Sequence, residues 1–271
     1  MTGRMKALLA APSPGPGPGI APYITAGDGG LERTLAVLHG LERGGAVCVE
    51  LGLPFSDPLA DGPALQAAAQ RSLEAGTTPD ATLEVIRSYR DQGGKLPILL
   101  FSYSNPLWVG LGGLRASAER LAEAGGDGFV VPDLPPEEAD ELCAACDELD
   151  LGTVFFATPR SSIERIRSAA RASSGFLYAI GRVGVTGLRT SFDDEVLDWL
   201  DFVRELAGNT PLAVGFGVAE PADIRALAGH TDLAICGTAL VNHLHNTAGT
   251  PEDAAASAQA LVTRLSQATR D

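Results

Sequence analysis

The chain has 271 residues, 45% of them hydrophobic and 20% charged, and its formal net charge is −14. This excess of acids argues against nucleic acid and anionic membranes as partners, because clusters of Lys and Arg hold phosphate groups. There is no run of 18 apolar residues, so no membrane span is expected. Residues 1–19 are rich in Pro and Gly and are expected to form an irregular lead-in, followed by one domain over residues 20–271.

The four cysteines favour a reducing, cytoplasmic compartment. Cys48 and Cys236 lie in apolar runs and are interpreted as small core residues. Cys143 and Cys146 form a C-x-x-C pair inside a helical pattern, whereas redox pairs stand at strand-to-helix junctions and zinc sites need further ligands. No metal site is therefore predicted.

Eight short apolar runs recur along the chain, each followed by an amphipathic helical pattern. Most runs lack strict alternation, as expected for parallel strands covered on both faces. Several of the helical patterns end in Gly, the usual stop signal. The predicted strands span residues 22–27, 46–54, 96–103, 126–134, 153–159, 175–181, 211–217 and 233–239.

Eight β-then-α units in a chain of this length predict a single-domain (β/α)₈ TIM barrel of the α/β class. A doubly wound sheet would require a G-x-G-x-x-G turn after the first strand, and "TAGDGGLERT" does not match it. The gap over residues 55–95 leaves room for an extra helix.

Carboxylates cluster around the second predicted strand in "ELGLPFSDPLADGP", residues 50–63. Glu50 falls inside the apolar run, so one strand parity would point it into the barrel, where burial raises the pKa of a carboxyl group. Asp61 follows in a polar Gly/Pro loop and is expected to stay ionised. Two carboxyl groups in unlike environments can divide acid and base work. Alternatively, Glu50 pairs with a buried Arg, and Asp57 and Asp61 only form turns.

Glycine-rich segments follow the last three predicted strands, at residues 181–187, 215–221 and 236–239. Glycine lets the backbone approach an anion, and helix N-termini offer free N–H groups. Barrels often bind phosphate with these loops, so a phosphate site is predicted here, although glycine also serves as ordinary turn punctuation. The first of the three loops has the composition of a lid.

From about Pro22 to about Leu265 the chain resembles the tryptophan synthase α subunit family. The motifs that carry the resemblance are "YITAGD", "ELGLPFSDPLADGP", "GDGFVVPDLPPEE", "YAIGRVGVTG" and "VGFGV". The resemblance implies a cytoplasmic carbon–carbon lyase of tryptophan biosynthesis. Its reaction would be the retro-aldol cleavage of indole-3-glycerol phosphate to indole and glyceraldehyde 3-phosphate. It also implies no cofactor, and a β subunit as partner in an αββα heterotetramer that receives the indole.

The resemblance further assigns roles to individual residues. Glu50 takes the general acid–base position, and Asp61 the position that binds the indole N–H and balances its positive charge. Asp57 matches a residue that communicates with the β subunit. The implied substrate-binding residues are Tyr23, where the family usually has Phe, Tyr103, Tyr178 and Thr186, and the implied phosphate-binding residues are Gly187, Gly217, Gly237 and Thr238.

The sequence departs from the family pattern in several places. "GDGG" at residues 27–30 replaces the usual Gly-Asp-Pro, "ATPRSS" replaces an Ala-Pro-Thr run, Thr238 replaces a serine, and "LVNHL" at residues 240–244 lacks the usual lysine. These departures leave a stand-alone indole-3-glycerol phosphate lyase as the alternative reading. A non-catalytic activator of a β subunit and another sugar-phosphate barrel enzyme are further alternatives. Intact Glu50 and Asp61 argue against the activator, and no lysine at a strand end is placed for Schiff-base chemistry.

Overall fold

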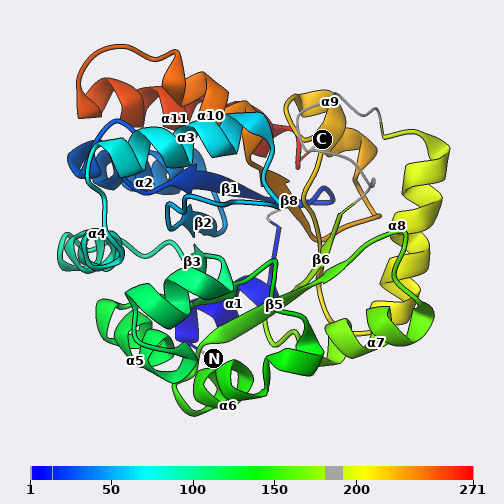
Figure 1. Ribbon diagram of the computed structural model, residues 1–271. Helices are drawn as coiled ribbons and strands as arrows, with labels where there is room; N and C mark the ends of the chain where they lie inside the picture. The colour runs from blue at the N-terminus through cyan, green and yellow to red at the C-terminus, as the bar shows by residue number, and fades with distance from the viewer. Residues whose placement is uncertain (1, 14, 181–191, 271) are drawn as a thin grey trace.

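The computed structural model describes residues 2–13, 15–180 and 192–270. Eight parallel strands close into a barrel in chain order, with β8 pairing back to β1 (Figure 1). The predicted barrel is therefore confirmed. Its strands are β1 Gly19–Thr25, β2 Val49–Gly52, β3 Ile98–Phe101, β4 Gly128–Val130, β5 Gly152–Ala157, β6 Leu177–Ala179, β7 Leu212–Val214 and β8 Leu233–Cys236.

Helices surround the barrel, and the connection from β2 to β3 carries two of them, which confirms the extra helix expected there (Figure 1). A π-helical turn, η1 Pro106–Gly110, follows β3, and a 3₁₀ turn, η2 Pro136–Glu138, follows β4. The α-helices are α1 Gly3–Ala10, α2 Leu31–Gly44, α3 Pro63–Glu74, α4 Pro79–Asp91, α5 Leu114–Ala124, α6 Asp140–Glu148, α7 Ile163–Ala172, α8 Asp194–Ala207, α9 Pro221–Ala226, α10 Thr238–His245 and α11 Pro251–Gln267.

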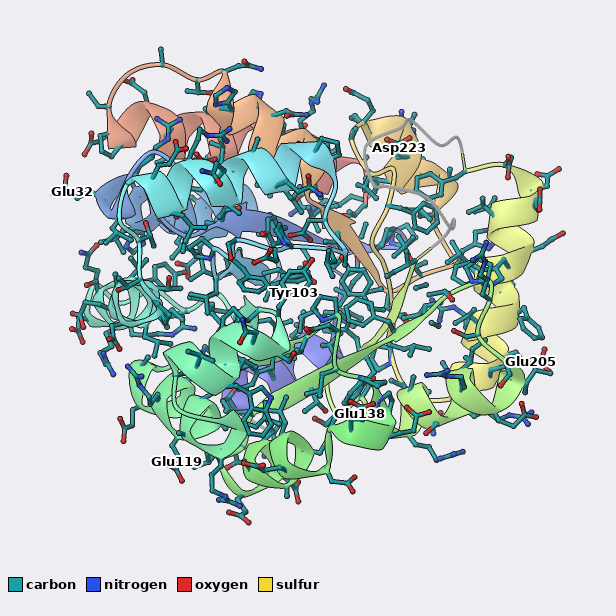
Figure 2. The ribbon with its side chains drawn as sticks, in the orientation of Figure 1. Glu32, Tyr103, Glu119, Glu138, Glu205 and Asp223 are labelled. Atoms are coloured by element: carbon teal, nitrogen blue, oxygen red, sulfur yellow. The ribbon has the colours of Figure 1, made fainter. Side chains whose placement is uncertain are left out.

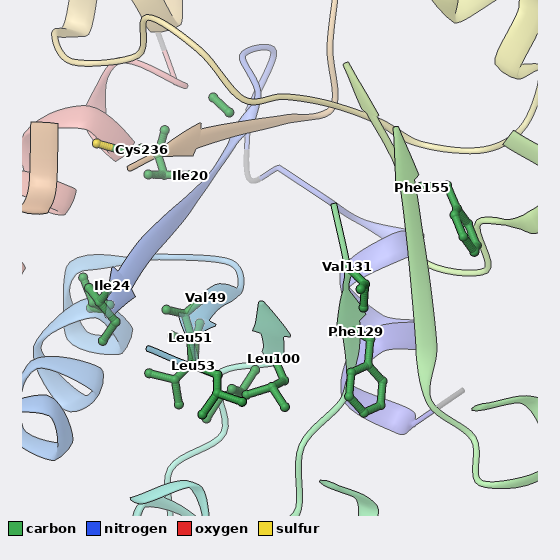
Figure 3. Close-up of a cluster of buried hydrophobic side chains, with 14 of the residues drawn as sticks. Ile20, Ile24, Val49, Leu51, Leu53, Leu100, Phe129, Val131, Phe155 and Cys236 are labelled. Atoms are coloured by element: carbon green, nitrogen blue, oxygen red, sulfur yellow. The ribbon is translucent and has the colours of Figure 1, made fainter. Parts of the chain in front are cut away.

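Alternate residues of each strand enter two separate apolar layers. On β2, Val49 and Leu51 point outward into the layer between strands and helices, which also holds Leu100 and Phe129 (Figure 3). The inward positions of the strands supply a second cluster in the barrel lumen. Glu50 stands between Val49 and Leu51, so the pleat of the strand directs it to the lumen.

Residues 3–10, expected from the sequence to be irregular, form the helix α1. The Thr2 side chain caps the helix by accepting a hydrogen bond from the Met5 amide. Met5 and Leu8, three residues apart and therefore on one helix face, are buried and belong to the lumen cluster. The helix is stabilised because this apolar face packs into the lumen cluster. Such a tertiary contact cannot be predicted from a short sequence segment.

A buried carboxylate, Asp127, ties α1 to the barrel. Its Oδ1 accepts hydrogen bonds from Thr2 Oγ1 at 2.6 Å and Arg4 Nε at 2.9 Å. Its Oδ2 accepts hydrogen bonds from Arg90 Nη2 at 2.8 Å and the Ile98 amide at 2.9 Å. Asp127 is 0% exposed, yet both of its oxygens are bonded, so burial leaves no polar atom of this carboxylate unsatisfied.

Candidate active site

The Glu50 carboxyl group lies in the barrel lumen, and the described residues do not give it the partners that a buried acid normally has. Glu50 pairs in register with Tyr23 of β1 and Leu99 of β3, and only 1% of it is exposed. Within the described residues, Oε1 of Glu50 has no hydrogen-bond partner and no arginine or lysine forms an ion pair with this acid. The alternative of a buried Arg partner therefore finds no support in this part of the chain.

Asp61 is buried as well, which differs from the polar loop environment expected from the sequence. It is 6% exposed, because the loop after β2 folds back over the barrel mouth before α3 begins. Two hydrogen bonds fix its backbone: its amide donates to the Pro58 carbonyl at 3.0 Å, and Gln66 Nε2 donates to the Asp61 carbonyl at 2.8 Å.

The pKa values of these two carboxyl groups fall on either side of neutrality. Burial, and then the negative charge of Asp61, raise the pKa of Glu50 to about 8. Burial raises the pKa of Asp61 to about 6, against the opposing effect of a hydrogen bond from Tyr103. Near pH 7 Glu50 is therefore mostly neutral and Asp61 mostly charged, which is the pairing that divided acid–base work requires.

Aromatic rings line the lumen beside these acids. Tyr23 packs edge-on against Phe101 at 5.3 Å between ring centroids, and Phe101 lies 6.4 Å from Tyr103. Tyr178 lies 4.9 Å from Phe156. Tyr103 occupies the centre of the molecule, whereas acids such as Glu119 and Glu205 lie at its periphery (Figure 2). The structure thus brings together three tyrosines predicted to line one cavity.

Phe101 and Gly215 contribute to this lumen but were not among the residues expected there. Phe101 stands two residues before Tyr103, so the strand alternation places both inside, and this parity was the available signal. A Cβ atom on Gly215 would lie 1.8 Å from Tyr178 Cε1, so the tyrosine ring can occupy its place only because position 215 has no side chain.

Part of the predicted phosphate site lies at the start of α10. Gly237 is the N-cap of this helix and Thr238 its first residue, so both lie beside backbone N–H groups of the first turn. Gly217 follows β7, which pairs with β8, so both loops leave neighbouring strands at the same end of the barrel. Thr186 and Gly187, the other residues predicted in this region, lie outside the described residues.

The loop that carries Asp61 also presents exposed side chains. Asp57 is exposed and its carboxylate accepts a hydrogen bond from Ser56 Oγ at 2.6 Å. Leu59 is 93% exposed, and in η1 Trp108 and Val109 are 52% and 80% exposed. The Ala60 amide donates to Tyr103 Oη at 2.9 Å, which holds this loop against the segment that leads into η1. We call Leu59, Trp108 and Val109 the mouth patch.

A closed barrel of eight parallel strands, with two buried carboxyl groups and aromatic rings at its lumen, defines the class as a (β/α)₈ barrel with a candidate active site in the lumen. The sequence profile of the tryptophan synthase alpha chain matches residues 16–270, nearly the whole chain. The chain belongs to the tryptophan synthase alpha chain family.

Curated relatives agree with this membership. The tryptophan synthase alpha chain of Geotalea daltonii is 38% identical over 247 residues, covering 91% of this chain and 92% of the relative. That of Trichormus variabilis is 43% identical over 235 residues, covering 86% of each.

Solved structures share the fold over the full length. A chain of tryptophan synthase from Mycobacterium tuberculosis has a TM-score of 0.84 and 29% identity, covering 99% of this chain and 97% of that one. Tryptophan synthase subunit alpha from Legionella pneumophila has a TM-score of 0.83 and 32% identity, with 98% and 96% covered.

The described residues contain neither a membrane-spanning helix nor a cluster of metal-binding side chains. None of the helices in the described part of the chain is long and apolar enough to cross a membrane. Across the same ranges, no group of three or more His, Cys, Asp or Glu side chains gathers in a way that could hold a metal ion.

Proposed function

We propose that Glu50 and Asp61 carry out the tryptophan synthase α reaction in this chain. The alpha subunit of the family is a lyase that cleaves indole-3-glycerol phosphate and pairs with the β subunit in tryptophan biosynthesis. The products are indole and glyceraldehyde 3-phosphate. The reaction breaks one carbon–carbon bond, so it needs a proton delivered to a ring carbon and a positive charge balanced at the ring nitrogen.

Glu50 supplies and recovers the proton. The neutral carboxyl group first protonates indole C3, which places a positive charge on the ring nitrogen. The resulting carboxylate then takes the proton from the hydroxyl on the adjacent glycerol carbon. As the C–C bond breaks, its electron pair returns to the ring, the hydroxyl carbon becomes the aldehyde, and Glu50 is protonated again. A pKa of about 8 suits a group that must give and take a proton near neutrality.

Asp61 balances the charge that forms in between. Its carboxylate accepts a hydrogen bond from the indole N–H and stabilises the cation once C3 is protonated. This interaction is stronger in the transition state than with bound substrate, which is the condition for raising kcat. Tyr23, Tyr103 and Tyr178 surround the indole ring, and the loops at Gly217, Gly237 and Thr238 bind the phosphate.

The single observation that carries this proposal is the Glu50 oxygen that has no hydrogen-bond partner among the described residues. A buried polar atom left without a hydrogen bond costs free energy, about 1–3 kcal/mol, and most proteins satisfy such atoms. Here the orphaned oxygen faces an aromatic-lined lumen beside a second acid. Bound substrate supplies the missing hydrogen-bond partner. The protein tolerates the free-energy cost of burying this oxygen because the carboxyl group is then available for the reaction.

The mouth patch is proposed as part of the surface that the β subunit covers. Its three side chains are large, apolar and exposed. Leu59 lies in the loop that holds Asp61, and Trp108 and Val109 lie in η1, which follows the Tyr103 segment bonded to that loop. Covering them removes apolar surface from water and holds that loop in place. Asp57, exposed in the same loop, then communicates the contact to the active site.

A cytoplasmic location is proposed as well. All four cysteines are free, and three of them are buried. Thiols kept free in this way are typical of a reducing compartment.

The test is indole release by the purified chain, measured alone and with a β subunit added. The proposal predicts measurable cleavage alone and a higher rate with β, because loop closure excludes water and completes the site. Asp57→Ala should lose most of the stimulation and little of the basal rate. Glu119→Ala, a change to a peripheral acid on α5 (Figure 2), serves as the control and should keep both.

No indole release under either condition would overturn the proposal. A fast reaction alone that ignores added β subunit would instead establish the stand-alone lyase, and Asp57→Ala would then have no effect on the rate.

A further inference from the structure

A cavity of about 210 Å³ lies outside the barrel lumen, where α2, α3 and α10 meet beside β1 (Figure 1). It is smaller than the usual sites of drug-sized ligands, ~300–1,000 Å³, so it suits a small molecule. Apolar side chains cover one part of it, and the polar part is basic. The lining residues are Ile24, Val37, Val241 and Leu244 on the apolar part, and Thr25, Asp28, Gly29, Arg33, Thr34, Arg71, His245 and Thr247 on the rest.

The lining carries an excess of positive charge in a chain whose net charge is −14. Two arginines, Arg33 and Arg71, face one carboxylate, Asp28, which gives +1 with His245 neutral. Arg71 binds Asp28 through two hydrogen bonds of 2.7 Å from Nε and Nη2. The charge of Arg33 is therefore left without a carboxylate partner in the described residues.

Among the described residues, neutral backbone groups hold Arg33 in place. Its Nη2 donates to the carbonyls of Leu244 at 2.7 Å and Thr247 at 2.9 Å, at the C-terminal end of α10. In the described part of the chain its Nε and Nη1 have no hydrogen-bond partner. A guanidinium group fixed by one nitrogen keeps donors on the other two for an anion, in the fork geometry that suits a carboxylate.

Gly29 makes this position of Arg33 possible. It has φ of +81°, and a Cβ atom there would lie 2.5 Å from Arg33 Cδ. Proline fixes φ near −65° and could not adopt this backbone. The replacement of the usual Gly-Asp-Pro by "GDGG" therefore permits the observed placement of Arg33. The "LVNHL" segment, a second departure, supplies Val241 and Leu244 to the same cavity.

We propose that this cavity binds a small organic monocarboxylate, with Arg33 holding the carboxylate and Ile24, Val37, Val241 and Leu244 contacting its apolar part. Arg71, which is paired with Asp28, and His245 line the edge of the cavity and offer N–H donors there. The site is separate from the lumen and its existence does not depend on the proposed catalytic roles. Inorganic phosphate, which has no apolar part, should bind more weakly.

The test uses benzoate as the probe and methyl NMR of the full chain as the readout. Benzoate should shift the methyl signals of Val37, Val241 and Leu244, with a dissociation constant of about 1 mM or below. The lumen methyl groups of Leu99, Val154 and Ile235 report whether the probe enters the barrel instead. Acetate and phosphate should bind at least ~10-fold more weakly than benzoate, and benzylamine should not bind.

Variants separate binding from support of the fold. Arg33→Gln should weaken benzoate binding ~10-fold or more, Arg33→Lys should restore part of it, and Arg87→Gln on α4 should change nothing. If Arg33→Gln destabilises the chain, His245→Gln, at the exposed edge of the cavity, gives a second test and should weaken binding measurably.

Three results would overturn the proposal. The first is absence of shifts at the cavity methyl groups with benzoate at 20 times the expected constant, roughly 20 mM. The second is equal binding of benzylamine. The third is unchanged benzoate binding in both Arg33→Gln and His245→Gln, which would leave Arg33 with the structural role of holding the end of α10.

Discussion

Two buried acids of this barrel stand in opposite conditions. Asp127 is fully buried and receives four hydrogen bonds, two of them from arginine side chains. Glu50 is equally buried, but one of its oxygens has no partner in the described residues. Asp127 joins α1, α4 and the base of the barrel, whereas Glu50 faces the lumen beside Asp61.

The contrast teaches how burial alone should be interpreted. A buried carboxylate with all its hydrogen bonds made stabilises the ionised form and the contacts around it. A buried carboxyl group without them favours its neutral form, and the raised pKa makes it a proton donor near neutral pH. Hydrogen-bond partners, more than depth of burial, therefore distinguish the structural acid, Asp127, from the acid proposed for catalysis, Glu50.

The largest expected effect is that of Glu50→Gln on turnover. The amide has the same size but cannot transfer the proton, so indole formation should fall ~10²–10⁴-fold in a kcat assay. The free energy of unfolding of the Glu50→Gln variant, measured by urea denaturation at pH 8, should equal or exceed that of the parent chain. A variant that kept more than a tenth of the parent rate would remove Glu50 from the acid–base role.

Glu50 should also make the stability of the parent chain depend on pH in a defined direction, and Glu50→Gln should remove this contribution. The pKa of Glu50 is raised from 4.5 in the unfolded chain to about 8 in the folded one, so the folded state holds the proton more tightly. The parent loses stability as pH rises from about 4.5 to about 8, and Glu50→Gln removes that loss.

Asp61→Asn should cost nearly as much activity by a different route. The amide keeps a similar shape but has no charge for the indole cation, so kcat should fall ~10²–10³-fold while KM changes little. Steady-state kinetics separate the two constants. A change confined to KM would mean that Asp61 only positions the substrate.

Asp127→Asn is the matched change at the structural acid and should show the reverse pattern. It removes the charge that faces Arg90, which is largely buried, and Arg4, which is partly exposed. Unfolding free energy should fall by about 3 kcal/mol in urea denaturation, and kcat at 25 °C should stay within about threefold. Loss of activity without loss of stability would break the comparison between the two acids.

Tyr103→Phe should have the smallest effect. Its hydroxyl group lowers the pKa of Asp61 and accepts a hydrogen bond from the Ala60 amide. Without it the pKa of Asp61 should rise further above its ordinary value, so activity near pH 6 should fall more than activity near pH 8. An unchanged ratio of the two rates would separate Tyr103 from the charge state of Asp61.

The eight-strand barrel could be predicted from the sequence, because eight apolar runs alternate with helical patterns along the chain. The alternation of side chains along a strand also indicated that one parity would point Glu50 into the lumen. The burial of Asp61 could not, since it depends on how the loop after β2 folds over the mouth, which the Gly/Pro composition does not indicate. The helix α1 and the partners of Asp127 could not be predicted from the sequence either. Both depend on contacts between residues far apart in the sequence, up to 125 positions for Thr2 with Asp127.

The pH dependence of kcat/KM for indole formation tests the central claim most directly, because it reports the essential acid and base of the free enzyme. With Asp61 charged and Glu50 neutral in the active form, the rate should fall below pH of about 6 as Asp61 is protonated, and above pH of about 8 as Glu50 loses its proton. The predicted result is a bell-shaped profile with these two limbs. A profile that stays level or keeps rising well above pH 8 would contradict the assignment of Glu50 as the proton donor.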